Sequence, residues 1–203
     1  MGTTREPPDP VIRQGARAAG VAVSVFECPL EALRAEHHRQ RQICDDMELL
    51  AATDVPRPAL AVSIVEAWCR DTMLHHLDED RGLFPRLRAR ALPEDDIDLL
   101  LDRLSSDHHD RVSCPESLLA ALACMADGAL PAPEDRAALR ALAQATRRHL
   151  TLENAVLLPL AGLRLTAGDR AALLAEMRAR RVQPAVLSAR CRQILGAGTD
   201  LAD

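Results

Sequence analysis

The sequence predicts an all-α protein, an up-down-up-down four-helix bundle with a short C-terminal fifth helix. Only 1% of its residues are aromatic, and the 48% that are hydrophobic are mostly Leu, Ala and Val, which favour helices over strands. Apolar residues recur at spacings of three and four, the period of one buried helix face. Two motifs also occur twice each, which indicates two helical hairpins related by an internal twofold axis.

The first helix is expected from about Pro29 to about Ala52. Proline is well placed in a first turn, because the N–H that it lacks has no intrahelical partner there. A 3–4 alternation marks the buried stripe of this helix: Leu30, Leu33, His37, Cys44, Met47 and Ala51. Residues 53–58 contain two prolines and are expected to form a turn.

The second helix is expected to begin at about Ala59. Its inward stripe is Ala61, Val65, Trp68, Thr72, His75, Glu79 and Gly82. Trp68 lies two turns from His75 on the same face, where we expect it to fill the bundle interior. Pro85 is expected to kink or end the helix, because proline lacks an N–H and its ring clashes with the preceding turn.

The third helix is expected to carry Ile97, Leu101, Leu104 and His108 inward. Beyond it, Ser113–Glu116 either begins a new helix with a capping box or kinks one long helix. The fourth helix is expected to open at Pro131–Asp135. Its inward stripe is Leu139, Leu142, Thr146, His149, Glu153, Val156 and Leu160.

The fifth helix is expected from Thr166 to about Arg181, with a polar tail beyond Pro184. It begins a cluster of arginines that extends into the tail: Arg178, Arg180, Arg181, Arg190 and Arg192. We interpret the cluster as a solvated face that complements the helix dipole, with docking of a partner as the alternative. The predicted organisation is an N-terminal arm (1–28), the bundle (29–165) and a C-terminal helix and tail (166–203).

Composition excludes several classes of function. The formal net charge of −5 gives no reason to expect nucleic acid or an anionic membrane as partner. All 25 basic residues are Arg, so Schiff-base chemistry on Lys is excluded. The six cysteines show no Cys-x-x-Cys spacing and are expected to be reduced thiols, which predicts a cytoplasmic protein. The sequence leaves a homodimer as an option.

The segments His75–Pro85 and His149–Pro159 are two copies of one motif. In each, His and Glu are four residues apart, and Leu and Pro follow eight and ten residues after the His. Both copies also have a Thr three residues before the His, at Thr72 and Thr146. Residues four apart share a helix face, so each copy directs one imidazole and one carboxylate to a common point.

A second motif, an acidic residue followed by His-His, is also repeated, at Glu36–His38 and Asp107–His109. All seven histidines fall within these four motifs. Their stripe positions predict a shared site inside the bundle formed by His37, His75, Glu79, His108, His149 and Glu153. Glu36 and Asp107 are expected to lie around this site or at the surface.

Two inward glutamates favour bound metal, because burying an unpaired carboxylate costs several kcal/mol. The simpler alternative is a polar layer in which each Glu bonds only its own His. Imidazole with carboxylate ligands fits iron, manganese or zinc, and two shared carboxylates favour a dinuclear centre. His38, His76 and His109 lie about 100° round the helix from the inward positions. We expect them at the solvent edge or behind the ligands, with Asp80 orienting His76.

These motifs resemble the hemerythrin-like, or HHE cation-binding, superfamily, in particular its bacterial single-domain members. The matching segments are Glu36–Arg41, His75–Asp80, Leu83–Pro85, Glu153–Ala161 and Met177–Arg181. The resemblance implies a four-helix bundle holding two iron ions with an oxo, hydroxo or water bridge, manganese and zinc being less favoured. The implied ligands are His37, His75, Glu79, His108, His149 and Glu153. The chain departs from the oxygen-carrier pattern at Val112, in place of a second His, and at Asn154, in place of Asp.

Three functions follow as hypotheses from this resemblance. The first is a module that binds or senses O₂, NO or peroxide at a four-His, two-Glu centre. The second is a di-iron enzyme that consumes peroxide, NO or O₂ in stress defence. The third is an iron-storage or iron-sensing regulatory protein whose basic C-terminal helix reports metal occupancy.

Overall fold

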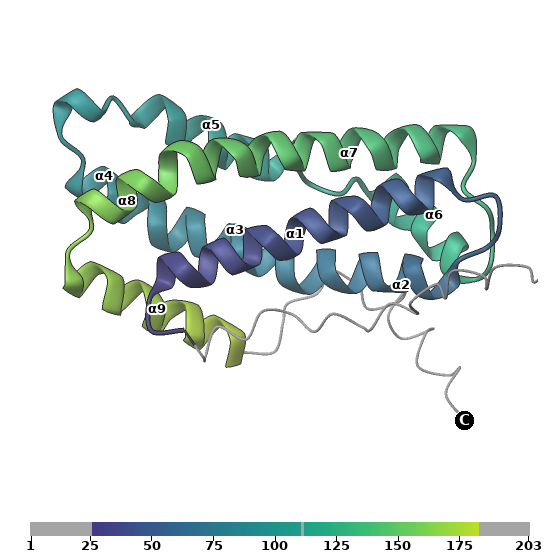
Figure 1. Ribbon diagram of the computed structural model, residues 1–203, viewed down its shortest axis with the longest axis horizontal. Coiled ribbons are helices and arrows are strands. Elements are labelled where there is room, and N and C mark those ends of the chain that lie inside the picture. The colour runs from purple at the N-terminus through teal and green to yellow at the C-terminus, as the bar shows by residue number, and fades with distance from the viewer. Residues whose placement is uncertain (1–25, 111, 183–203) are drawn as a thin grey trace, which may run out of the picture.

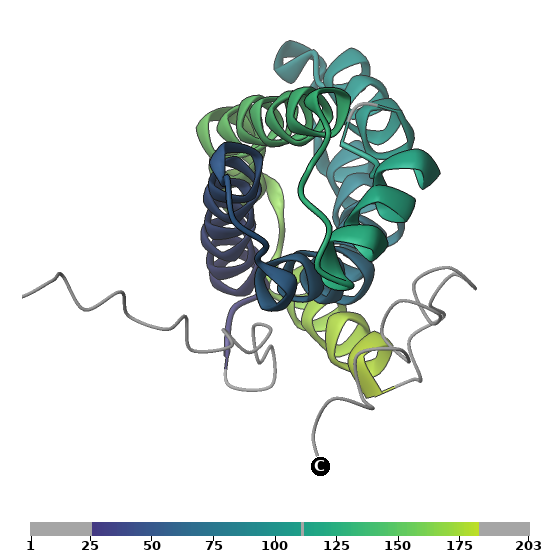
Figure 2. The same ribbon diagram turned by 90° about the vertical axis from the view of Figure 1, so that its right-hand side faces the viewer.

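The structure is a computed structural model and describes residues 26–110 and 112–182. Every regular element in these ranges is helical and none is a strand, which confirms the predicted all-α class. The long helices lie side by side along the molecule (Figure 1) and, seen end-on, surround a common interior (Figure 2). Most of the expected N-terminal arm and the tail beyond Pro184 fall outside the described residues.

The first hairpin pairs α1 (Pro29–Ala52), which has the predicted bounds, with an unbroken second helix over 58–90. The second helix consists of α2 (Pro58–Glu66), a π-helical segment η2 (Ala67–Thr72), α3 (Met73–Asp78), a second π-helical segment η3 (Glu79–Leu83) and α4 (Phe84–Arg90). The helix continues past Pro85 to Arg90, so the expectation that Pro85 ends it is wrong. The wide turn η3, closed by the Phe84 N–H on the Glu79 carbonyl, accommodates the proline instead.

The second hairpin has a divided first half. A short 3₁₀ turn η4 (Pro93–Asp95) leads into α5 (Asp98–His109), and a separate helix α6 (Glu116–Ala126) follows. The alternative of a new helix is therefore confirmed, but its capping box is wrong, because Pro115 is the N-cap and no side chain caps the helix. The return helix consists of α7 (Pro133–Leu152), a π-helical segment η5 (Glu153–Leu157) and α8 (Leu158–Arg164).

The apolar core is divided into two clusters by a polar layer. One cluster lies toward α6 and includes Ile43, Met47, Leu50, Ile64, Trp68, Leu122, Met125 and Leu139. The other lies toward α9 (Ala167–Val182) and includes Leu33, Leu83, Phe84, Leu87, Leu101, Leu104, Leu158 and Leu173. On each helix, the residues between the two clusters are those of the repeated His and Glu motifs.

The C-terminal helix α9 packs on the first hairpin near the start of α1 and beside α3 (Figure 1). It begins with a reciprocal cap, in which the Asp169 N–H donates to Thr166 Oγ1 and the Thr166 N–H donates to the Asp169 carboxylate. Gly82 allows the close approach, because a Cβ there would lie 2.6 Å from Leu173 Cδ1. The division of the chain at residues 29–165 and 166–203 stays a prediction.

The cysteines of the described residues differ in state. Cys28, Cys44, Cys114 and Cys124 are free thiols. Cys69 is disulfide-bonded, so the expectation of reduced thiols throughout is wrong at this position. Burial raises the pKa of Cys44 to about 11 and that of Cys114 to about 12, which keeps these thiols protonated and unreactive. None of the helices in the described part of the chain is long and apolar enough to cross a membrane.

Candidate metal centre

The polar layer brings together all six side chains that the sequence predicted as ligands. Each helix of the bundle contributes: His37 from α1, His75 from α3, Glu79 from η3, His108 from α5, His149 from α7 and Glu153 from η5. All six are buried, and both glutamates are 0% exposed. The two π-helical segments that begin with a glutamate, η3 and η5, occupy equivalent places in the two hairpins.

The donor atoms form two groups of four, each within 4.8 Å of one another. We call His37 and His75 the first half-site, and His108 and His149 the second half-site. Each pair is completed by the same two glutamates, Glu79 and Glu153, which therefore belong to both groups. Carboxylates shared in this way can bridge two cations.

In the first half-site, His37 Nε2 lies 3.6 Å from Glu79 Oε1 and 3.5 Å from Glu153 Oε2. His75 Nε2 lies 3.4 Å from Glu79 Oε2. Both imidazoles are almost fully enclosed, at 0% and 1% exposure. The two rings meet edge to face with centroids 4.8 Å apart, so their Nε2 atoms converge on the shared carboxylates.

In the second half-site, His108 Nε2 lies 3.3 Å from Glu79 Oε2 and 3.9 Å from Glu153 Oε1. His149 Nε2 lies 2.9 Å from Glu153 Oε1 and 3.1 Å from His108 Nε2. The rings of His108 and His149 also meet edge to face with centroids 4.8 Å apart. The second half-site therefore repeats the arrangement of the first.

Opposite charges hold the cluster together in the metal-free protein. Burial alone lowers the pKa of His75, but the carboxylates of Glu79 and Glu36 outweigh it and raise that pKa to about 9. Burial also opposes protonation of His108, yet the hydrogen bond to Asp80 and the nearby carboxylates of the two central glutamates raise its pKa to about 11. The pKa of Glu79 lies well below its usual value, because the surrounding imidazoles outweigh the effect of burial.

The donor set fits bound cations better than a purely hydrogen-bonded polar layer. Both carboxylate oxygens of Glu79 and both of Glu153 are buried without a hydrogen-bond partner in the described part of the chain. The Nε2 atoms of His37 and His75 are also buried without one. Such groups are costly unless a cation or a donor satisfies them. A cation in each of the two donor groups would satisfy these oxygen and nitrogen atoms.

The acidic residue before the first His of each hairpin contacts the second His of the same hairpin. Glu36 Oε2 lies 3.0 Å from His75 Nδ1, within hydrogen-bond distance. Asp107 Oδ2 lies 3.8 Å from His149 Nδ1, at the corresponding place. A carboxylate behind an imidazole fixes the orientation of the ring and raises its basicity toward a metal. This arrangement gives the repeated acidic-His sequence a physical role.

The residue after each glutamate contacts the first His of the other hairpin. Asp80 Oδ2 lies 3.0 Å from His108 Nδ1, and the Asn154 side-chain amide lies 2.9 Å from His37 Nδ1. The expectation that Asp80 orients His76 is therefore wrong. These two contacts were not predicted from the sequence, although the parallel positions of Asp80 and Asn154 in the two motif copies were a signal for them.

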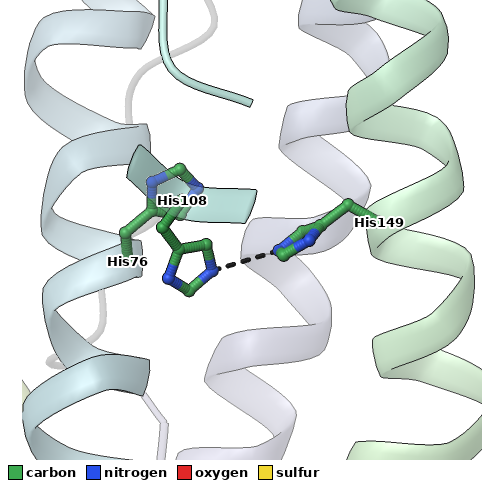
Figure 3. A group of neighbouring side chains, drawn as sticks. All are labelled: His76, His108 and His149. Atoms are coloured by element: carbon green, nitrogen blue, oxygen red, sulfur yellow. Dashed lines mark hydrogen bonds between the residues drawn. The ribbon is translucent and has the colours of Figure 1, made fainter. Parts of the chain in front are cut away.

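The three remaining histidines divide into two kinds. His38 and His109 are exposed, as expected at the solvent edge, and contact Gln42 and the Ser105 carbonyl. His76 is half-buried and stacks on His108, with centroids 4.1 Å apart and ring planes 10° apart (Figure 3). Its ring nitrogen also lies within 4.8 Å of donor atoms of His108 and His149. The second half-site thus has a third imidazole beside it.

Two arginines of α9 form ion pairs with buried carboxylates next to the first half-site. Arg181 lies 2.5 Å from Glu36 and 2.6 Å from Asp78, and Arg180 lies 2.5 Å from Asp78. The interpretation of Arg180 and Arg181 as a solvated face is therefore wrong, because both side chains are used in ion pairs with buried carboxylates. Arg190 and Arg192 lie outside the described residues.

Helices that enclose two linked groups of imidazole and carboxylate donors define a metal-binding helical bundle. Residues 28–161 match the family model of the hemerythrin HHE cation binding domain, and the chain belongs to this family. The resemblance recognised in the sequence is thereby confirmed, and α9 lies beyond the matched residues. Neither the curated proteins nor the solved structures contain a match.

Proposed function

We propose that the protein is a non-haem di-iron protein that binds or senses O₂ or a related small molecule, NO or peroxide. The observation that supports this is the pair of donor groups that share Glu79 and Glu153. His37 and His75 would hold one ion, His108 and His149 the other, and the glutamates would bridge them. Imidazole with carboxylate donors and no thiolate favours iron over softer metals.

The donor count leaves room for an added ligand. Two imidazoles and two shared carboxylates give each ion four protein donors, fewer than the six of an octahedral ion. An iron pair would supply reversible exchange of electrons with a small molecule bound there. The chain's own residues hold the imidazoles in place from behind, through Glu36, Asp80 and Asn154.

Optical spectroscopy of the iron-loaded protein tests this proposal. Anaerobically reduced protein mixed with O₂, or separately with NO, should develop new absorption bands, and dithionite or removal of the gas should reverse them. Sustained consumption of peroxide or NO by the same preparation would instead indicate the enzymatic alternative. Iron-loaded protein whose spectrum does not respond to any of the three molecules would contradict the proposal.

Iron sensing is a second candidate, favoured by the contact between α9 and the first half-site. Arg181 bonds Glu36, and Glu36 in turn bonds His75. Occupancy of the first half-site could therefore change how firmly α9 is held. Amide hydrogen exchange of residues 167–182 should then become slower when metal is added. An exchange rate that is the same with and without metal would count against sensing.

A further inference from the structure

A layer of buried polar groups lies one helical turn from the imidazoles, on the side of α6, and has no part in the metal centre described so far. Gln40 follows His37 by three residues and is 3% exposed. Thr72 and Thr146 precede His75 and His149 by three residues and are 1% and 2% exposed. The two threonines therefore occupy equivalent places in the two hairpins.

The polar atoms of this layer have no partner in the structure. Thr72 Oγ1, Thr146 Oγ1 and Gln40 Nε2 are buried and make no hydrogen bond to any residue that the structure describes. A threonine inside a helix usually bonds the carbonyl of the preceding turn, as Thr151 does with the Arg147 carbonyl at 2.7 Å. Native proteins rarely leave buried hydroxyls and amides unpaired, so these three groups require a partner other than the described side chains and backbone.

The surroundings limit what that partner can be. One turn further from the metal centre the apolar cluster begins, with Trp68 and Ala143. A partner between the imidazoles and this cluster is therefore small, and it must accept hydrogen bonds from hydroxyl and amide donors.

The backbone of the second helix changes at this layer. The π-helical segment η2 ends at Thr72, whereas α7 is regular α-helix at Thr146. A π-helical turn inserts an extra residue and shifts the side chains that follow, and such turns are frequent at functional sites. Unlike η3 and η5, this segment contains none of the six candidate metal ligands. Because it ends at Thr72, we connect it with the layer formed by Thr72, Thr146 and Gln40.

We propose that Thr72, Thr146 and Gln40 form the binding site for the exogenous ligand of the metal centre. The inference rests on the proposed di-iron function and specifies the ligand class: a di- or triatomic molecule that accepts hydrogen bonds when bound. Each hydroxyl donates its O–H, and Gln40 donates from Nε2. Ligands that gain negative charge on binding are favoured over weak acceptors such as carbon monoxide.

Azide is the probe for the test, because it is triatomic, anionic and a hydrogen-bond acceptor. Iron-loaded, oxidised full-length protein is titrated with azide, comparing the wild type with the double variant Thr72→Val and Thr146→Val. We expect unchanged iron content and an azide affinity lower by about fivefold for each hydroxyl lost. The vibrational frequencies of bound azide should shift in D₂O in the wild type and shift less in the double variant.

Thr151→Val is the matched control, because Thr151 lies on the same helix but bonds the backbone; its azide affinity should equal that of the wild type. Should the double variant not fold, each single valine variant is expected to show the fivefold loss, and the serine variants, which keep the hydroxyl, to retain affinity. A full iron load with unchanged azide affinity and D₂O shift in the valine variants overturns this inference alone. A wild type that takes up no iron overturns the proposed function as well.

Discussion

The two half-sites share their glutamates but differ in what surrounds them. The first half-site is closed, with its imidazoles at 0% and 1% exposure, and is connected through Glu36 to Arg181 on α9. The second half-site is slightly more open, at 6% for His108 and 4% for His149, and a third imidazole, His76, stacks against it. The internal repeat thus produces equal donors in unequal environments.

The difference arises from residues that the repeat does not keep. The residue after the central glutamate is a carboxylate, Asp80, beside the second half-site, but a neutral amide, Asn154, beside the first. Glu36, the carboxylate behind His75 in the first half-site, is balanced by the guanidinium of Arg181. We therefore expect the second ion to lie in the more negative environment, which stabilises the higher oxidation state there.

The largest expected effect on metal content comes from replacing the two glutamates that the half-sites share. Replacing Glu79 or Glu153 with Ala takes a donor from both groups, so we expect loss of most bound metal from both half-sites. Elemental analysis of the purified protein measures this, with Glu31→Ala as an exposed control on α1. A Glu79→Ala protein that keeps its full metal content would show that the glutamates do not bridge.

The stability of the protein against unfolding should depend on pH with opposite signs in the metal-free and the metal-loaded protein. Without metal, the pKa values of His75 and His108 are raised to about 9 and about 11, above about 6.5 in the unfolded chain. The stability they provide is complete below about pH 6.5 and falls as the pH rises through these values. Metal requires neutral imidazoles, so the loaded protein should instead lose metal and stability on acidification.

Thermal unfolding at pH 5, 7.5 and 9.5, with and without metal, measures these trends. Calorimetric titration with metal at pH 7.5 in two buffers should also show proton release from His75 and His108, one in each half-site. A loaded protein that melts at the same temperature at pH 5 and pH 7.5 would contradict the metal assignment.

The carboxylate behind the imidazole should contribute more to metal affinity in the first half-site than in the second. Glu36 lies 3.0 Å from His75, whereas Asp107 lies 3.8 Å from His149. Removing a carboxylate behind a metal-bound His costs about 10- to 100-fold in metal affinity. We expect Glu36→Gln to fall in this range and Asp107→Asn to cost less, as measured by competition with a chelator. The reverse order would show that the 3.8 Å contact closes when metal binds.

Substitutions that break the ion pair between α9 and Glu36 are expected to have a smaller effect, seen in the midpoint potential. Arg181→Gln removes the positive charge that balances Glu36, which should move the midpoint potential of the iron centre to more negative values. Glu36→Gln removes a negative charge and should move it the other way. Arg178, which among the described residues bonds the Phe26 carbonyl and no carboxylate, provides the control as Arg178→Gln. Shifts of the same sign in Arg181→Gln and Glu36→Gln would indicate general disturbance of the fold instead.

The smallest effect on metal binding is expected at His76. Its ring is nearly parallel to that of His108, whereas two imidazoles that bind one ion each direct a ring nitrogen toward it in the plane of the ring. His76→Phe keeps the stack and should change the metal affinity less than about threefold, within the context-dependence of a single contact. Loss of one ion per chain in this variant would identify His76 as a ligand.

Periodicity and repetition made the central site predictable. His37, His75, Glu79, His108, His149 and Glu153 lie on the inward stripes of their helices, and the structure brings all six together. The contacts behind them were not predictable in the same way. Asp80 was expected to reach His76, four residues earlier on its own helix, but contacts His108 on another, because that pairing depends on how the helices are aligned.

The π-helical segments and the role of α9 were also not predictable from the sequence. A proline inside a helical pattern signals a disturbance at Pro85, but its form, the wide turn η3, depends on the packing around the glutamate. Arg180 and Arg181 lie on a helix whose charge pattern is typical of a solvent-exposed face. Only the docking of α9 on the first hairpin shows that they neutralise the buried carboxylate of Asp78.

The most direct test of the proposed dinuclear site is the number of metal ions bound by the intact chain. Protein loaded anaerobically with ferrous iron, freed of excess metal and analysed for iron per chain should contain two ions, and the Glu79→Ala variant should contain almost none. One ion per chain in the wild type, or none, would contradict a pair of half-sites joined by shared glutamates.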